Sequence, residues 1–123
     1  MGFILVIEDD MGILGLIEAA LTRFGHRVET AADGGEGIRK FDGGRFDMVI
    51  TDYLMPGVDG EGVMAHIRRS SRRQTPIIGM SGTPWLLNGA GFDLVLAKPF
   101  PLKQLIEAVS SLSAAPMLSE AAA

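Results

Sequence analysis

Residues 48–60 read MVITDYLMPGVDG, a short apolar run followed by an acidic residue and a turn. Met48–Ile50 is apolar at every position, which is typical of a strand buried on both faces of a parallel sheet. Asp52 comes directly after this run and Thr51, and Pro56 and Gly57 then interrupt regular structure. The stretch predicts a buried parallel strand that presents a carboxylate at its carboxyl end.

Similar apolar runs lie on both sides of this stretch. They are Phe3–Ile7, Ile77–Met80 and Leu94–Ala97, and the more polar run Arg27–Ala31 is expected to form an edge strand. Between the runs, apolar residues recur at three- and four-residue steps, the period of an amphipathic helix. The alternation predicts an α/β fold in which helices cover both faces of a parallel sheet.

Cap signals indicate where several helices begin and end. Gly25 is expected to stop the first helix, and Asp33 with Glu36 resembles a capping box before the second. Asp59 is expected to cap the third helix, and Pro101 suits the first position of the last one.

Length and composition limit the possible classes of protein. The 123 residues fit one domain, which we expect at 1–112, followed by a mobile tail at 113–123. The net charge of -4 disfavours nucleic acid or an anionic membrane as the main partner. Without cysteine, the chain has neither disulfides nor thiolate metal sites. The first apolar run lacks a basic leader and is too short to span a bilayer, which predicts a cytoplasmic location.

Charged and polar residues follow four of the predicted strands. Glu8 and Asp9 follow the first, Asp52 the third, Ser81 the fourth and Lys98 the fifth. In an open parallel sheet, ligands bind in the crevice beyond the carboxyl ends of the strands. We therefore expect these side chains to lie close together at one edge of the sheet.

The charges of this group predict its chemistry. Neighbouring carboxylates repel one another, and a single lysine does not balance three of them, so a hard divalent cation is expected. Magnesium is favoured when a phosphate is another ligand. A carboxylate can act as a nucleophile toward phosphorus, and the transferred group needs a metal, a cation and hydroxyl donors around it. The cluster thus contains the parts that a magnesium-dependent site needs to accept a phosphoryl group on a carboxylate.

With these motifs in this order, the sequence resembles the receiver domain of two-component response regulators from Phe3 to Leu112. The matching residues are Glu8-Asp9-Asp10, Asp52 with Met55-Pro56-Gly57 and Asp59-Gly60, Ser81-Gly82, and Lys98-Pro99-Phe100. The resemblance implies a doubly wound, flavodoxin-like sheet of five parallel strands in the order 2-1-3-4-5, and a cis Lys98–Pro99 bond.

The resemblance also implies a role for each site residue. Asp52 is the phosphoacceptor, Ser81 donates to one phosphoryl oxygen and Lys98 pairs with another. The implied Mg²⁺ ligands are Asp9, Asp52, Glu8 through water and the backbone carbonyl of Leu54. A histidine kinase or a histidine phosphotransfer protein supplies the phosphoryl group, and output is a phosphorylation-dependent contact with a downstream protein. We expect a stand-alone receiver that catalyses only its own phosphorylation and dephosphorylation.

Three positions depart from the family pattern. Val95 stands where receivers usually carry a switching Tyr or Phe. The stretch between Ser81 and Lys98 is several residues shorter than usual, and the glycines and proline within Thr83–Gly91 predict a shortened or missing fourth helix. Gly82 follows the hydroxyl residue and permits closer approach. These departures predict an output surface other than the usual one, involving Trp85.

Two other functions compete with the phosphoacceptor. One is a receiver-shaped adaptor whose binding does not depend on phosphorylation. The other is a phosphatase of the haloacid dehalogenase type, which shares an Asp nucleophile, magnesium and a lysine. That class needs a second Asp two residues after the nucleophile, where this chain has Leu54, and we reject it.

A basic run lies far from the acidic motifs in sequence. Its arginines are Arg68, Arg69, Arg72 and Arg73. We expect a solvated helix end, where cations face the negative pole of the helix dipole.

Overall fold

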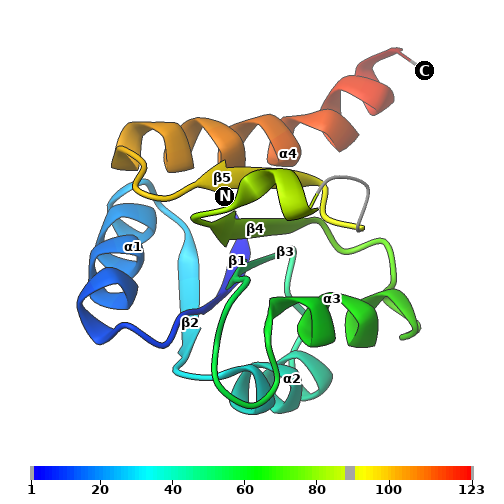
Figure 1. Cartoon of the computed structure of the whole chain (residues 1–123). Coiled ribbons are helices and arrows are strands. Elements are labelled where there is room, and N and C mark those ends of the chain that lie inside the picture. Colours follow the sequence, from blue (N-terminus) through cyan, green and yellow to red (C-terminus); the bar gives the residue numbers. More distant parts are fainter. Residues whose placement is uncertain (1, 88–90, 123) are drawn as a thin grey trace.

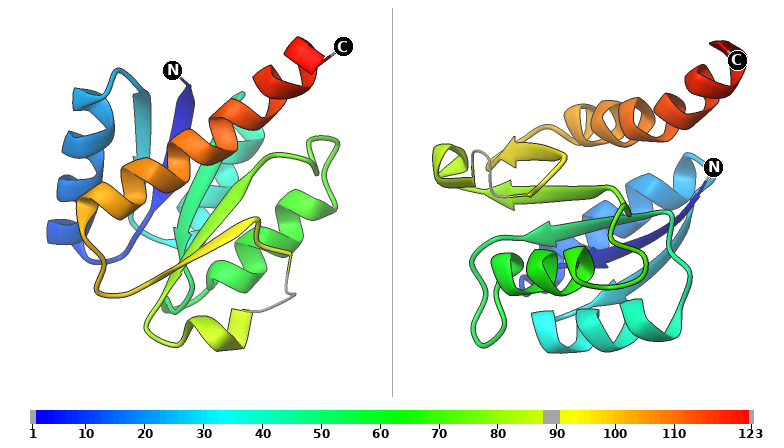
Figure 2. Two further views of the ribbon diagram at one scale, coloured as in Figure 1. Left: turned by 90° about the horizontal axis from the view of Figure 1, so that it is seen from above. Right: turned by 90° about the vertical axis from the view of Figure 1, so that its right-hand side faces the viewer.

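Five parallel strands form one sheet in the order β2-β1-β3-β4-β5, as expected from the sequence. The structure is a computed structural model that describes residues 2–87 and 91–122. The strands are β1 (Phe3–Ile7), β2 (Arg27–Ala31), β3 (Met48–Asp52), β4 (Ile77–Ser81) and β5 (Leu94–Ala97). The helices are α1 (Met11–Arg23), α2 (Gly34–Gly43), α3 (Gly60–Arg68) and α4 (Leu102–Ala122), with a short 3-10 helix η1 (Pro84–Leu87). Helices α1 and α4 cover one face of the sheet, and α2 and α3 cover the other (Figures 1 and 2).

Alternate residues of the central strands supply two separate cores. Ile4 and Val6 of β1 pack in the cluster that includes α1 and α4, whereas Leu5 and Ile7 pack in the cluster that includes α2 and α3. Successive side chains of a strand point to opposite faces, so a strand covered on both sides is apolar throughout. The polar run Arg27–Ala31 forms the edge strand β2, as predicted.

The predicted caps at Asp33 and Asp59 are present, whereas α4 begins at Leu102, one residue after the Pro101 that was expected to start it. Asp33 Oδ1 accepts a hydrogen bond from Glu36 N at 2.7 Å, and Glu36 Oε1 accepts one from Ala32 N at 2.8 Å, so the reciprocal pair reaches one residue further back than a standard capping box. Asp59 Oδ1 accepts from Gly62 N at 2.9 Å. These bonds satisfy amide groups that the first turn of a helix leaves without partners.

The connection between β4 and β5 contains η1 but no α-helix among its described residues, which agrees with the predicted shortening. Asn88, Gly89 and Ala90 of this predicted segment lie outside the described residues. A Cβ added to Gly79 of β4 would lie 3.0 Å from Leu87 Cδ2 and 2.9 Å from Phe92 Cδ1. The shortened connection thus covers the sheet directly with Leu87 and Phe92, and glycine leaves the space they need.

Helix α4 extends to Ala122 and includes most of the segment expected to be a tail. The boundary predicted at residue 112 therefore falls inside a helix, and the mobility of 113–123 stays a prediction. Within the described residues, no helix has both the length and the apolar character that a membrane span requires.

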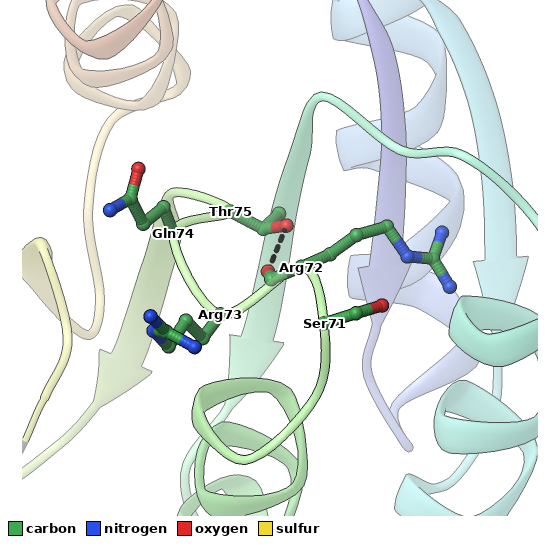
Figure 3. A pocket seen from close by; sticks show the side chains of 5 residues that line it. All are labelled: Ser71, Arg72, Arg73, Gln74 and Thr75. Carbon is green, nitrogen blue, oxygen red and sulfur yellow. Dashed lines mark hydrogen bonds between the residues drawn. The ribbon is translucent and has the colours of Figure 1, made fainter.

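Two arginines of the basic run connect elements instead of only facing solvent. Arg72 points from its loop toward α2, away from Arg73 and Gln74 (Figure 3). Its guanidinium donates to Phe41 O at 2.8 Å and to Gly44 O, at the C-terminal end of α2. Arg68 donates to Thr75 O and Asp93 Oδ2, each at 2.8 Å. The expected pairing of cations with helix C-terminal carbonyls is present, but Arg72 makes it with a neighbouring helix.

Candidate functional site

The carboxyl ends of four adjacent strands meet at one edge of the sheet. In the register, Ile7 of β1 lies opposite Thr51 of β3, and Asp52 lies opposite Met80 of β4. Lys98 N donates to the backbone oxygen of Ser81 at 2.8 Å. Strand pairing therefore brings residues distant in sequence to the same edge, as expected for a parallel sheet.

Three carboxylates converge there. Glu8, Asp9 and Asp52 each offer an oxygen within 4.8 Å of the others, close enough for one cation to bind all three. Glu8 is fully buried and Asp52 is 7% exposed, whereas Asp9 is exposed to solvent. Asp9 is therefore the member of the cluster that faces solvent.

Lys98 connects the two buried acids. Its Nζ lies 2.8 Å from Glu8 Oε1 and 3.1 Å from Asp52 Oδ1. Backbone amides add further donors, since Asp10 N donates to Glu8 Oε2 and Tyr53 N donates to Asp52 Oδ1, each at 3.1 Å. These contacts fix the orientation of both carboxylates.

The electrostatics of the pocket favour an additional cation. Burial raises the pKa of Glu8 and of Asp52, and repulsion from Asp52 and from Asp9, respectively, adds to this effect. Burial lowers the pKa of Lys98, but its hydrogen bonds and charge attraction with Glu8 and Asp52 outweigh this, so the net direction is upward. One ammonium group, that of Lys98, faces three carboxylates, so the site carries excess negative charge. The oxygens of these carboxylates form a set of hard donors. It fits Mg²⁺, which prefers such ligands.

Ser81, the expected hydroxyl donor, and Leu54, the expected carbonyl ligand, lie in different elements around the acids. Ser81 is 2% exposed at the end of β4, and its Oγ accepts from Thr83 N at 2.9 Å and lies 3.2 Å from Thr83 Oγ1. Leu54 lies two residues after Asp52 in the β3–α3 loop, with a 67% exposed side chain. Glu8, Asp52 and Lys98 thus form one bonded network, whereas Ser81 lies on the neighbouring strand and is bonded to Thr83.

Two neighbours of the site have roles that the sequence reasoning missed. Asp10 holds Glu8 through its backbone and caps α1, because its Oδ1 accepts from Gly12 N at 2.9 Å. A Cβ on Gly60 would lie 2.4 Å from the backbone oxygen of Asp52, so α3 begins in direct contact with the end of β3. Asp just before a helical pattern was an available signal for the cap; the close approach at Gly60 had no local signal.

Comparison with known proteins agrees with this geometry. Residues 4–110 match the response regulator receiver domain family. The transcriptional regulatory protein TcrA of Mycobacterium tuberculosis is 37% identical over 115 residues, covering 89% of this chain and 45% of TcrA. The chain thus spans about half the length of the curated relatives it matches.

Two solved structures extend the similarity to three dimensions. Response regulator TrrA of Thermotoga maritima, in complex with Mg²⁺–BeF, gives a TM-score of 0.83 at 32% identity, over 91% of this chain and 99% of that one. Chemotaxis response regulator CheY4 of Vibrio cholerae gives 0.84 at 29% identity, over 91% and 98%.

Receiver domains are signalling domains that histidine kinases phosphorylate, and they are not turnover enzymes. The strand order, the acid pocket with its lysine and the match over residues 4–110 all lead to the same assignment. The chain belongs to the response regulator receiver domain family of two-component systems.

Proposed function

We propose that Asp52 accepts a phosphoryl group in a Mg²⁺-dependent reaction and that the protein signals through a phosphorylation-dependent protein contact. One observation carries this proposal: Lys98 Nζ lies within 3.1 Å of Asp52 Oδ1 in a pocket where three carboxylates converge. A buried carboxylate so placed has a cation beside it, and the neighbouring Asp9 is exposed to solvent.

The metal site of the proposal uses the residues around Asp52. Asp9 and Asp52 bind Mg²⁺ directly, Glu8 binds through water, and Leu54 contributes its backbone carbonyl. The observations that support this set of ligands are the convergence of the three carboxylates and the position of Leu54 two residues after Asp52. When bound, Mg²⁺ neutralises charge that develops on the transferred phosphoryl oxygens.

The protein residues act on the phosphoryl group from two sides. An Asp52 oxygen attacks phosphorus, a P–O bond forms, and the P–N bond of a donor phosphohistidine breaks; a small phosphodonor can replace the histidine. Lys98 exchanges part of its contact with Asp52 for a phosphoryl oxygen, and Ser81 donates its hydroxyl proton to another. Dephosphorylation uses the same site, with water as the attacking group.

The donor in this proposal is a histidine kinase or a histidine phosphotransfer protein, acting in the cytoplasm. Support comes from the family to which the chain belongs. Stand-alone operation and the identity of the downstream partner stay predictions.

Intact-mass spectrometry tests the proposal. The protein is incubated with Mg²⁺ and a small phosphodonor, and we expect a gain of one phosphoryl group. Asp52→Asn should show no gain, because the amide is not a nucleophile of comparable strength. Asp42→Asn is the matched control: Asp42 is an exposed acid on α2 that pairs with His66, and this variant should gain the same mass as wild type. Equal phosphorylation of wild type and Asp52→Asn would contradict the assignment.

A second candidate function is a receiver-shaped adaptor that binds its partner without phosphorylation. The observation in its favour is Val95, which lies opposite Gly79 in the sheet and has no hydroxyl or aromatic ring for the usual switch. Binding of a captured partner to unphosphorylated and phosphorylated protein separates the two functions. Equal affinities would favour the adaptor, and a higher affinity after phosphorylation would favour the first proposal.

A further inference from the structure

The β3–α3 loop, residues 53–59, contains Leu54, whose carbonyl is one of the proposed magnesium ligands. The ends of the loop are fixed, because Tyr53 N donates to Met80 O at 2.9 Å and Gly60 N donates to Tyr53 O at 2.8 Å. Between these ends, the backbone groups of residues 54–58 make no hydrogen bond with any other residue that the structure describes. The position of Leu54 therefore depends on how the loop packs against other elements.

Two residues in the middle of the loop provide this packing. Met55 is 8% exposed and lies in the core beneath α2 and α3. Val58 lies between the first turns of the two helices, and the loop thus reaches the start of α2 (Figure 1). A Cβ added to Gly34 of α2 would lie 2.9 Å from the carbonyl carbon of Val58 and closer still to its oxygen. A Cβ added to Gly62 of α3 would lie 2.9 Å from Val58 Cγ1.

The contact at Gly34 differs from the contact at Gly62 in what must move to admit a side chain. At Gly62 the neighbour is a methyl group, which can rotate away, whereas at Gly34 the neighbour is backbone, so the loop or the helix must shift. The backbone conformation of Gly34 does not itself require glycine, because its φ lies outside the left-handed region. Alanine is also the better helix former. Glycine at position 34 therefore serves the close approach of the loop.

The start of α2 is also connected to the opposite side of the acid cluster. Ala31 O, at the end of β2, accepts a hydrogen bond from Glu8 N at 3.0 Å. Asp33 then caps α2 by accepting from Glu36 N at 2.7 Å, and Gly34 follows directly. The first turn of α2 is thus held near Glu8 on one side and contacts the loop on the other. A shift at Gly34 changes the position of the loop relative to the carboxylates.

We propose that Gly34 is a positioning residue of the magnesium site. Its missing side chain lets α2 contact the backbone of Val58, and this contact sets the position of the loop that contains Leu54. Gly34 touches neither the ion nor the phosphoryl group and acts through Val58. The inference rests on the proposed function, because it concerns the metal ligands proposed around Asp52.

A Mg²⁺ titration of ¹⁵N-labelled protein, followed by two-dimensional NMR without a phosphodonor, gives the dissociation constant. We expect Gly34→Ala to weaken Mg²⁺ binding about tenfold, as is typical when residues that support metal ligands are changed. This variant should also shift the amide signals of residues 54–58 before Mg²⁺ is added. Gly35→Ala is the matched control in the same turn, because the nearest atom to its added Cβ is Asp33 Oδ1 at 3.4 Å, an ordinary contact. It should bind Mg²⁺ as wild type does.

Two further variants separate loop position from stability. Leu21→Ala removes a buried side chain from the core on the other face of the sheet, so it lowers the free energy of unfolding but should keep the wild-type Mg²⁺ affinity while folded. Val58→Gly adds no atoms, at a position that is 38% exposed, and removes the side chain held between α2 and α3. It should also weaken Mg²⁺ binding, and it decides the test if Gly34→Ala does not fold.

The outcomes separate this inference from the proposed function. The intact mass of wild type after incubation with Mg²⁺ and a small phosphodonor is measured in parallel. If wild type gains the phosphoryl mass and Gly34→Ala binds Mg²⁺ as wild type does, the positioning role is overturned and the proposed function stands. Equal weakening in Gly35→Ala or Leu21→Ala also overturns the positioning role. Absence of any mass gain in wild type overturns the proposed function and this inference with it.

Discussion

At the scale of single residues, Lys98 balances the charges of the site. Its ammonium contacts both buried acids, and each of those acids has a pKa raised first of all by burial. An acid whose pKa is higher in the folded chain than in the unfolded chain binds more protons when folded. The free energy of unfolding therefore falls as the pH rises from the pKa of the unfolded chain to the pKa of the folded chain. Above that interval both acids are charged, and the burial of their charges opposes folding.

Replacing Lys98 should show how much the burial of these two charges destabilises the folded chain. Lys98→Met leaves Glu8 and Asp52 buried without their cation, and we expect the free energy of unfolding to fall by about 2 kcal/mol in metal-free buffer at neutral pH. Urea denaturation measures the change. Lys103→Met, at an exposed position of α4, should change it little. Similar losses in the two variants would mean that the charge balance in the pocket is not the cause.

Replacing Asp52 should have the opposite effect on the free energy of unfolding. Asp52→Asn removes a buried charge but leaves the 2.8 Å contact between Lys98 and Glu8, so no cation is left unpaired. We expect the free energy of unfolding in metal-free buffer to rise by about 1 kcal/mol. A decrease would show that the ion pair with Lys98 outweighs the burial of the Asp52 charge.

At the scale of elements, α3 begins against the end of β3. Gly60 N donates to Tyr53 O at 2.8 Å, and a Cβ at position 60 would meet backbone atoms of Asp52 and Tyr53 at 2.4 and 2.7 Å. Backbone atoms cannot move aside as a flexible side chain can. The position of α3 and the position of Asp52 therefore depend on the same backbone contacts.

Gly60→Ala should disturb both. We expect a loss of about 2 kcal/mol in the free energy of unfolding, as for other overpacked sites, and slower phosphorylation of Asp52. Gly15→Ala in α1 is the matched control, because nothing lies within 4 Å of its added Cβ. Alanine is the better helix former, so this variant should gain about 0.5–1 kcal/mol. Denaturation midpoints and phosphorylation rates check both; an unaffected Gly60→Ala variant would refute the packing argument.

At the scale of the whole molecule, binding of Mg²⁺ should stabilise the folded state. The three carboxylates converge only after β1 and β3 pair, so the unfolded chain lacks the site and the ion shifts the equilibrium toward the folded protein. We expect the melting temperature to rise with Mg²⁺ concentration in wild type and much less in Asp9→Asn. Asp42→Asn should behave as wild type. An equal rise in Asp9→Asn would place the bound ion elsewhere.

Much of the molecule was predictable from local patterns. The five strands lie where the apolar runs placed them, because a strand covered on both faces needs an apolar residue at every position, and the edge strand β2 is recognisable by its polar residues. Asp33 and Asp59 were recognisable as caps from their residue type and spacing. The helical backbone beyond residue 112 did not follow from the Ser- and Ala-rich pattern, and the sequence placed the domain boundary inside α4.

The sequence by itself determined the α/β class, the alternation of elements and which residues end the strands, because these depend on periodicity and residue type over a few positions. Only the tertiary structure decided the distances: Lys98 between Glu8 and Asp52, Gly60 against the end of β3, and Leu87 with Phe92 over Gly79. The reason is physical. Each of these contacts joins residues from different elements, and its geometry depends on how the whole sheet and its covering layers pack, which no short window of sequence contains.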